Sequence, residues 1–197
     1  MMKKAKTYFA LALFAGLMTV SATPATEAAA KTVAEQKLPN QLRNGKFDLV
    51  TKKGIAADWS IWKKDDSQAK VQIEKKAGVD QSSAAVFSGG NCSYFTWAKV
   101  QGGEKVYAKI KTRKIGEGAA VLAMRFQDAN RKWLPFTVSK TVAFSESGEW
   151  VTVELVVKAP ANTKTAVPMF SVKNLESPES KVFLDDVEVY ILPASGK

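Results

Sequence analysis

The stretch Trp150-Val151-Thr152-Val153-Glu154-Leu155-Val156-Val157-Lys158 decides the fold class. Every second residue from Val151 to Val157 is aliphatic, and this two-residue period gives an extended strand one wholly apolar face. Residues 119–127 follow the same period, with apolar side chains at each even-numbered position. Both segments therefore predict strands that pack on a hydrophobic core.

Short β-like runs continue along the chain from Leu42 onward, separated by turns rich in Gly, Asn, Asp and Ser. No long helix and no repeat of fixed period is visible. The predicted strands are residues 46–50, 69–75, 84–88, 92–100, 105–113, 119–127, 133–142, 150–158, 165–173 and 181–192. This pattern predicts an all-β fold, an antiparallel β-sandwich of the jelly-roll type.

The N-terminus has the features of a secretory signal peptide. Three lysines among the first six residues precede an apolar run, residues 8–20, which is shorter than the ~20 residues that span a bilayer. Small-residue cleavage sites follow at Val20-Ser21-Ala22 and at Ala28-Ala29-Ala30. We therefore expect secretion to the extracellular space or the periplasm, with no membrane anchor after cleavage.

These features divide the chain into four parts. The predicted divisions are a signal peptide (1–30), a flexible leader (31–41), one β-sandwich domain (42–192) and a short tail (193–197). The domain is long enough to bury a core of its own, and we expect it to be a monomer.

Two scarce residue types exclude several kinds of catalysis. The chain has no histidine and a single cysteine, Cys92. Ser-His-Asp and Cys-His catalysis need an imidazole base, and ordinary zinc sites draw on His and Cys, so these chemistries are excluded. One cysteine cannot form an internal disulfide, so Cys92 is expected to be a small buried hydrophobe.

The chain is basic, with a formal charge of +10 that falls to about +8 without residues 1–30. Such a charge favours solubility and also attracts anionic polymers such as acidic polysaccharides. The Lys and Arg residues are scattered rather than concentrated on one segment, so no nucleic-acid partner is expected.

Five short motifs follow one another along the predicted domain. They are Leu42-Arg43-Asn44-Gly45-Lys46-Phe47-Asp48, Asp58-Trp59, Gly102-Gly103-Glu104-Lys105-Val106-Tyr107, Gly148-Glu149-Trp150 and Val182-Phe183-Leu184-Asp185-Asp186-Val187. In this order they resemble the motifs of carbohydrate-binding modules of families four, nine and twenty-two, jelly rolls of the galactose-binding-like superfamily. The resemblance covers nearly all of the predicted domain. It implies a module that binds a polysaccharide, and it assigns Trp59 and Trp150 to the framework.

The resemblance also implies a structural calcium ion that ties the first strand to the last, at Asp48 and Asp185. The two-residue period of the last strand, read from Phe183 to Val187 and onward, predicts that Asp185 points into the core. A buried carboxylate needs a cation or hydrogen-bond donors, and Ca²⁺ takes oxygen ligands. The alternative is that Asp185 accepts backbone N–H bonds.

Sugar binding needs aromatic rings that stack on pyranose faces and planar polar groups that bond to hydroxyls. Aromatic residues off the predicted core face are the candidates, and polar residues beside them on the strand 119–127 are the hydrogen-bonding candidates. The predicted ligand-binding residues are Trp62, Trp97, Tyr107, Arg125, Gln127 and Trp133. Arg125 would also suit a uronate carboxylate. The alternative for each tryptophan is an ordinary packing role.

Three functions remain open at this point. The first is a secreted, non-catalytic protein that binds a neutral or anionic polysaccharide through aromatic stacking in a shallow groove. The second is an extracellular structural, adhesive or protein-interaction domain. The third is a small glycan-active enzyme, which would need a carboxylate pair across a cleft. No recognisable pair is formed by its candidates Asp65, Asp66, Asp128 and Glu154.

Overall fold

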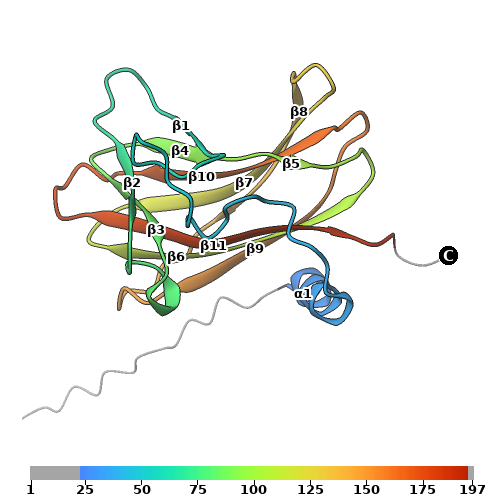
Figure 1. Cartoon of the computed structure of the whole chain (residues 1–197), viewed down its shortest axis with the longest axis horizontal. Helices are drawn as coiled ribbons and strands as arrows, with labels where there is room; N and C mark the ends of the chain where they lie inside the picture. Colours follow the sequence, from blue (N-terminus) through green and yellow to red (C-terminus); the bar gives the residue numbers. More distant parts are fainter. Residues whose placement is uncertain (1–22, 195–197) are drawn as a thin grey trace, which may run out of the picture.

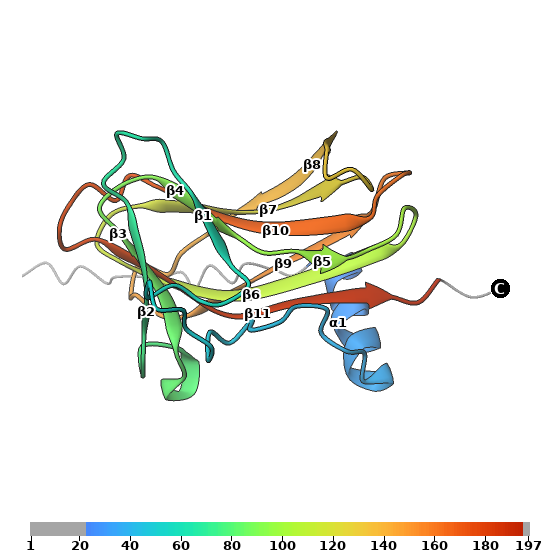
Figure 2. The same ribbon diagram turned by 45° about the horizontal axis from the view of Figure 1, so that its top comes forward.

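All strand pairings in the described residues, 23–194, are antiparallel, and the strands form two sheets packed face to face (Figures 1 and 2). The structure is a computed structural model. The six-stranded sheet has the order β1-β4-β10-β7-β8, with β5 beside β10, and the five-stranded sheet has the order β2-β3-β11-β6-β9. The expected all-β, antiparallel jelly-roll sandwich is thus confirmed.

The strand bounds follow the predicted runs closely. The six-stranded sheet contains β1 (Ser60–Trp62), β4 (Cys92–Phe95), β5 (Ala98–Lys99), β7 (Ala119–Gln127), β8 (Trp133–Thr141) and β10 (Thr165–Lys173). The five-stranded sheet contains β2 (Lys70–Glu74), β3 (Ala84–Ser88), β6 (Lys105–Ile115), β9 (Val151–Lys158) and β11 (Lys181–Leu192). Short β1 was not predicted, and the predicted strand 92–100 is divided into β4 and β5.

The predicted strand 46–50 is wrong. Asn44 and Phe47 adopt positive φ values of 55° and 59°, so the chain turns instead of extending. The Asn44 side chain closes this loop, because it accepts the N–H of Leu49 and donates to the carbonyls of Leu49 and Ala57. The only β-type contact here is an isolated bridge between Val50 and Ala56.

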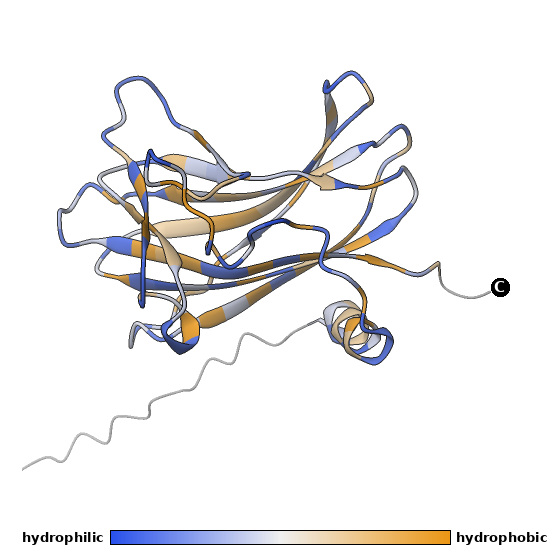
Figure 3. Ribbon diagram, in the orientation of Figure 1, coloured by the Kyte–Doolittle hydropathy of each residue, from blue (hydrophilic) through white to orange (hydrophobic). Residues whose placement is uncertain are grey.

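The core lies between the sheets and includes a cluster of aromatic side chains. Trp59 stacks on Tyr94 with 4.8 Å between ring centroids, and Phe47 lies 5.1 Å from Trp59. The Tyr94 hydroxyl accepts the Ala56 N–H, so the polar end of this buried ring is satisfied. Cys92 is also buried, and burial raises the pKa of its thiol to about 11, which confirms its expected place as a small core residue. Figure 3 shows orange, hydrophobic stretches alternating with paler or blue ones along the strands, whereas the loops are mostly blue.

A β-bulge in β11 overturns the predicted direction of Asp185. The pairing of β11 with β6 shifts between Asp185 and Glu188, and Asp186 has a positive φ of 46°. Even-numbered residues such as Leu184 face the core before the bulge, and odd-numbered residues such as Val187 face it afterwards. Asp185 therefore lies on the outer side of the five-stranded sheet, although it is fully buried.

A helix replaces the predicted flexible leader. Helix α1 (Pro24–Gln36) begins inside the predicted signal peptide 1–30 and extends into the predicted leader 31–41. Thr23 caps it by accepting the Thr26 N–H, and Pro24 occupies its first turn. The helix lies beside the five-stranded sheet (Figure 2), where Ala29 packs with Tyr107 and Leu192.

The segment that connects this helix to the domain is also fixed to the sheet. The Asn40 side chain accepts the Val189 N–H, and the Gln41 N–H donates to the Val189 carbonyl. The predicted apolar signal region, the Val20-Ser21-Ala22 site and residues 195–197 of the predicted tail 193–197 lie outside the described residues. Residues 23–194 contain no helix that is long and apolar enough to cross a membrane.

Because the second predicted cleavage site lies within this helix, the two sites would give mature chains of different stability. A chain that starts at Thr23 is expected to exceed one that starts at Lys31 in unfolding free energy by about 1–2 kcal/mol. The shorter chain loses the N-cap, worth about 1 kcal/mol, together with the contact of Ala29 on Tyr107 and Leu192. Urea denaturation of both purified chains measures the difference. Equal midpoints and slopes would show that the first half of α1 contributes nothing to stability.

Candidate functional site

Four of the predicted ligand-binding residues lie on one surface, the outer face of the six-stranded sheet. Cross-strand pairing sets this face, because directly opposed residues share a side of the sheet. Trp62 pairs with Ser93, which pairs with Ser171, and Arg125 pairs with Val167. We define the platform as six side chains on this face, the exposed Trp62, Trp97 and Trp133 and the half-buried Phe95, Arg125 and Met169.

Trp62 stands at one end of the platform, beside a surface hollow. Its side chain is 58% exposed at the end of β1. The hollow has a volume of about 570 Å³, and its walls come from the loop after β1, the turn before β4 and the end of β10. Ser93 and Ser171 also line it, and their hydroxyls hydrogen-bond to each other at 2.7 Å. This end can therefore offer a ring and hydroxyls to the same ligand.

Trp97 lies near the middle of the platform. It follows β4, and its ring meets that of Phe95 edge to face, with 5.3 Å between centroids. Met169 pairs with Phe95 across the strands, so the two side chains extend the apolar surface. Trp97 is 44% exposed, which leaves part of the ring open to a ligand. Sequence reasoning missed Phe95 and Met169, although the spacing of Phe95 and Trp97 indicates a shared side.

Arg125 and Trp133 stand together at the other end. The Arg125 guanidinium carbon lies 4.2 Å from the centroid of the Trp133 ring, a cation–π contact between β7 and β8. Trp133 is 42% exposed. Gln127 pairs with Trp133 and shares this side of the sheet, but only 8% of it is exposed, so it is largely covered.

Tyr107 does not belong to this surface, and its predicted role in ligand binding is corrected. It lies on β6 in the other sheet, is 2% exposed and packs with Ala29 of α1. Its hydroxyl donates to Glu154 at 2.6 Å, and its ring stacks on Tyr190. Burial raises its pKa, with the hydrogen bond to Glu154 adding to the effect. Tyr107 therefore anchors the helix.

The residues expected to hold calcium, Asp48 and Asp185, do not fit that ion in this structure. The Asp185 carboxylate accepts hydrogen bonds from the Val79 N–H, the Ser82 hydroxyl and the Asp186 N–H, which are donors where calcium needs oxygen ligands. Asp48 is exposed. Among residues 23–194, no three Asp, Glu, His or Cys side chains cluster as metal ligands would.

The backbone makes the connection that was expected of the ion. The Val187 N–H donates to the Gly45 carbonyl at 3.0 Å and so ties the segment before β1 to the last strand. The two segments approach so closely that residue 45 must be a glycine, because a Cβ there would lie 2.1 Å from the Val187 carbonyl oxygen. Asp185 instead holds the 3₁₀ turn η1 (Val79–Gln81) against the sheet.

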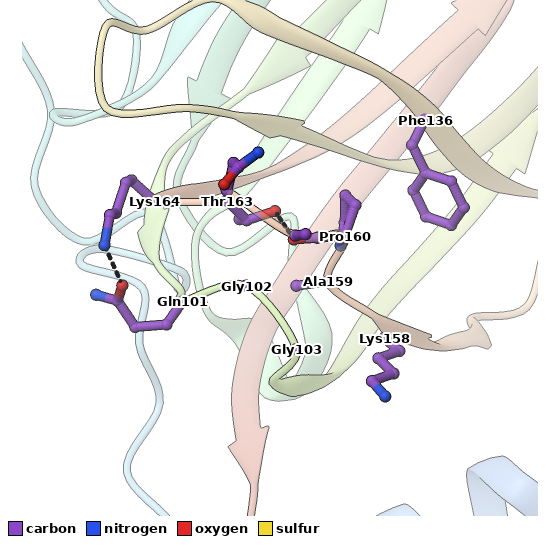
Figure 4. Close-up of a pocket in the computed structure, with 11 residues that line it drawn as sticks. Gln101, Gly102, Gly103, Phe136, Lys158, Ala159, Pro160, Thr163 and Lys164 are labelled. Atoms are coloured by element: carbon purple, nitrogen blue, oxygen red, sulfur yellow. Dashed lines mark hydrogen bonds between the residues drawn. The ribbon is translucent and has the colours of Figure 1, made fainter.

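A second hollow, of about 720 Å³, lies at the edge of the sandwich (Figure 4). It is bordered by the turn at Gly102-Gly103, by the connection from β9 to β10 and by Phe136. Lys164 donates to the Gln101 side chain at 2.7 Å on its rim. None of the predicted ligand-binding residues lines it, and Phe136 is its one aromatic side chain. The platform is therefore the stronger candidate site.

The carboxylates considered for catalysis are used elsewhere in the fold. Glu154 accepts the Tyr107 hydroxyl on the opposite sheet, and Asp128 accepts the N–H groups of Asn130 and Lys132 in the β7–β8 turn. Asp65 and Asp66 are exposed in the loop after β1. These four residues thus show no carboxylate pair across the platform.

No protein-family model matches the sequence, and no curated protein matches it. Solved structures, by contrast, are similar to this chain. The enzymatically active domain of bacteriophage CBA120 tailspike protein 4 has a TM-score of 0.59 at 13% identity, over 78% of this chain and 21% of that one. TmCBM61 in complex with β-1,4-galactotriose has a TM-score of 0.51 at 18% identity, over 78% of this chain and 99% of that one.

A family 16 carbohydrate-binding module is similar over 76% of this chain and 99% of its own, with a TM-score of 0.54 at 13% identity. The chain thus spans nearly the whole length of isolated modules, but about a fifth of the tailspike chain. At these identities the likeness establishes the fold. The chain has the jelly-roll fold of carbohydrate-binding modules.

Proposed function

We propose that the chain is a secreted, non-catalytic protein that binds a polysaccharide across the outer face of its six-stranded sheet. The observation that carries the proposal is the platform itself. Three tryptophans, each at least 42% exposed, stand on one face of one sheet, although they come from separate segments of the chain. Large apolar side chains are seldom left so exposed in a group unless they bind something.

The geometry suits a chain of sugar rings better than a single small ligand. Trp62 lies on the edge strand β1, and Trp133 lies on the opposite edge strand β8, with Trp97 between their positions in the sheet. A ligand that touches both ends must therefore cross the strands. The aromatic rings would stack on pyranose faces, and Ser93 and Ser171 would offer hydroxyls to the same polymer. The likeness to modules that bind sugar oligomers supports this assignment.

Trp97→Ala and Trp133→Ala are each expected to weaken binding to a retained polysaccharide at least about tenfold, which corresponds to about 1.4 kcal/mol. A panel of soluble polymers is first screened by affinity electrophoresis, and the retained polymer is then titrated calorimetrically. Phe136→Ala is the matched control, because Phe136 is 39% exposed and lines the other hollow. It should bind as the wild type does.

The screen also decides between the proposed function and the adhesive alternative. Retention by at least one polymer, lost in both tryptophan variants and kept in Phe136→Ala, supports glycan binding on the platform. Loss in Phe136→Ala alone would move the site to the edge hollow. If no polymer in the panel is retained, the proposed function is wrong, and a structural or protein-binding role takes its place.

A further inference from the structure

Acidic residues are divided unequally between the two sheets. The strands of the six-stranded sheet contain no Asp or Glu, and their basic residues are Lys99, Arg125, Lys140 and Lys173. The strands of the five-stranded sheet contain eight Lys and Arg residues together with Glu74, Glu154, Asp185, Asp186 and Glu188. The ion pairs formed among residues 23–194 lie in α1 or involve the five-stranded sheet. Arg125 is thus the charged member of the platform, and it lies in a sheet whose strands contain no acidic residue to balance it.

Arg125 is the cation placed among the platform rings. Its guanidinium lies over Trp133. This guanidinium forms neither an ion pair nor a hydrogen bond with any residue in 23–194. Stacking on a ring holds the plane of a guanidinium while leaving its edge N–H groups available. By contrast, three lysines on the facing sheet form ion pairs, as Lys109 does with Glu188 at 2.6 Å. Arg125 is therefore fixed and has unused donors.

The hollow beside Trp62 differs from this end of the platform. Lys64 and Lys173 line it together with Asp66 and Glu176, so its charges balance. An anionic group gains little there from net charge. Any preference for an anionic ligand is thus expected to come from the Arg125 end, where an aromatic ring and an unpaired guanidinium lie side by side.

We infer that the platform selects a polysaccharide that bears carboxylates, such as a uronan, and that Arg125 binds the carboxylate of a sugar unit beside the ring stacked at Trp133 or Trp97. The inference rests on the proposed function, whose ligand class it names. The planar fork of the guanidinium matches a carboxylate with two parallel N–H···O bonds. The strands of this sheet also contain no Asp or Glu that would repel such a polymer.

The test compares each anionic polymer with its own neutral form. Polygalacturonate, alginate and hyaluronan are each titrated before and after methyl esterification, which blocks the carboxylates and keeps the sugar backbone. The wild-type protein is expected to bind at least one acid form about tenfold more tightly than its ester, as a charge-assisted bidentate bond would give. Arg125→Gln should remove this preference and bind acid and ester alike. Arg125→Lys should keep only part of it, because the fork is lost.

Arg43→Gln is the matched control, since it removes the same charge from an exposed position in the loop before β1. It should keep the preference for the acid form. Equal losses in Arg43→Gln and Arg125→Gln, or abolition of binding by 0.5 M NaCl, would overturn the inference in favour of unspecific attraction. Binding that needs Trp97 and Trp133 but does not distinguish acid from ester would also overturn it while leaving the proposed function standing. Failure to bind either form of any polymer, together with failure in the neutral panel, would remove both.

Discussion

Trp59→Ala is expected to lower the free energy of unfolding by about 3–5 kcal/mol, whereas Trp62→Ala, three residues away, should change it by less than about 0.5 kcal/mol. Trp59 is 5% exposed and packs against Tyr94 and Phe47 in the core. Its indole N–H also donates to the Asn44 carbonyl at 3.2 Å and helps to close the loop before β1. Alanine would leave a cavity, and the Asn44 carbonyl would keep only its hydrogen bond from the Phe47 N–H.

Trp62 faces the opposite way and has no such role. It is 58% exposed on the platform, so its removal takes away little buried surface. The stability of both variants is measured by urea denaturation followed by circular dichroism, which does not depend on the tryptophan that is removed. Polysaccharide binding is measured on the same samples. The expected result is a crossed pattern, with stability lost in Trp59→Ala and binding weakened in Trp62→Ala. Similar losses of stability in both variants would contradict the division between core and platform.

The division between these two tryptophans shows what the sequence alone could predict. The motif Asp58-Trp59 assigned Trp59 to the framework, and the structure confirms that place. The two-residue period of strand 119–127 placed Arg125 off the core face, and this too is confirmed. A strand period states which side a residue faces. It does not state which strands are neighbours, and the register that brings β1, β7 and β8 into one sheet comes from long-range pairing.

The errors have local physical causes. Tyr107 was assigned to the ligand because its cover, helix α1, was not predicted: residues 24–30 were assigned to the signal peptide and residues 31–36 to the leader. Thr23 followed by Pro24 is nevertheless a usual start of a helix. The direction of Asp185 was wrong because one bulge changes the phase of every residue before it. That bulge depends on a positive φ at Asp186, a conformation that is uncommon for residues other than glycine and that the residue type alone does not reveal.

Asp185→Ala is expected to lower the free energy of unfolding by about 2–4 kcal/mol, because the Val79 N–H and the Ser82 hydroxyl lose a buried acceptor. Because hydrogen bonds satisfy the Asp185 carboxylate without calcium, EDTA is expected to leave the melting temperature of the wild type unchanged. A fall in melting temperature with EDTA that calcium reverses, and that is absent in Asp185→Asn, would establish the metal site instead. Asp80→Asn is the matched control for a change in the same turn, because Asp80 is exposed and its positive φ of 52° suits asparagine, and this variant should unfold as the wild type does.

The pH dependence of this effect has a defined sign. Burial raises the pKa of the Asp185 carboxyl above its usual value, although the hydrogen bonds from Ser82, Asp186 and Val79 oppose the shift. The folded protein therefore holds this proton more tightly than the unfolded chain, whose pKa is about 4. The contribution of Asp185 to stability is largest below pH ~4 and declines as the pH rises through the folded pKa, above which it is constant. The difference in unfolding free energy between the wild type and Asp185→Asn, whose side chain does not titrate, should show this decline. It is measured by urea denaturation between pH 3 and pH 8. A relative stability that rises with pH would mean that donors or a cation outweigh burial at this carboxylate.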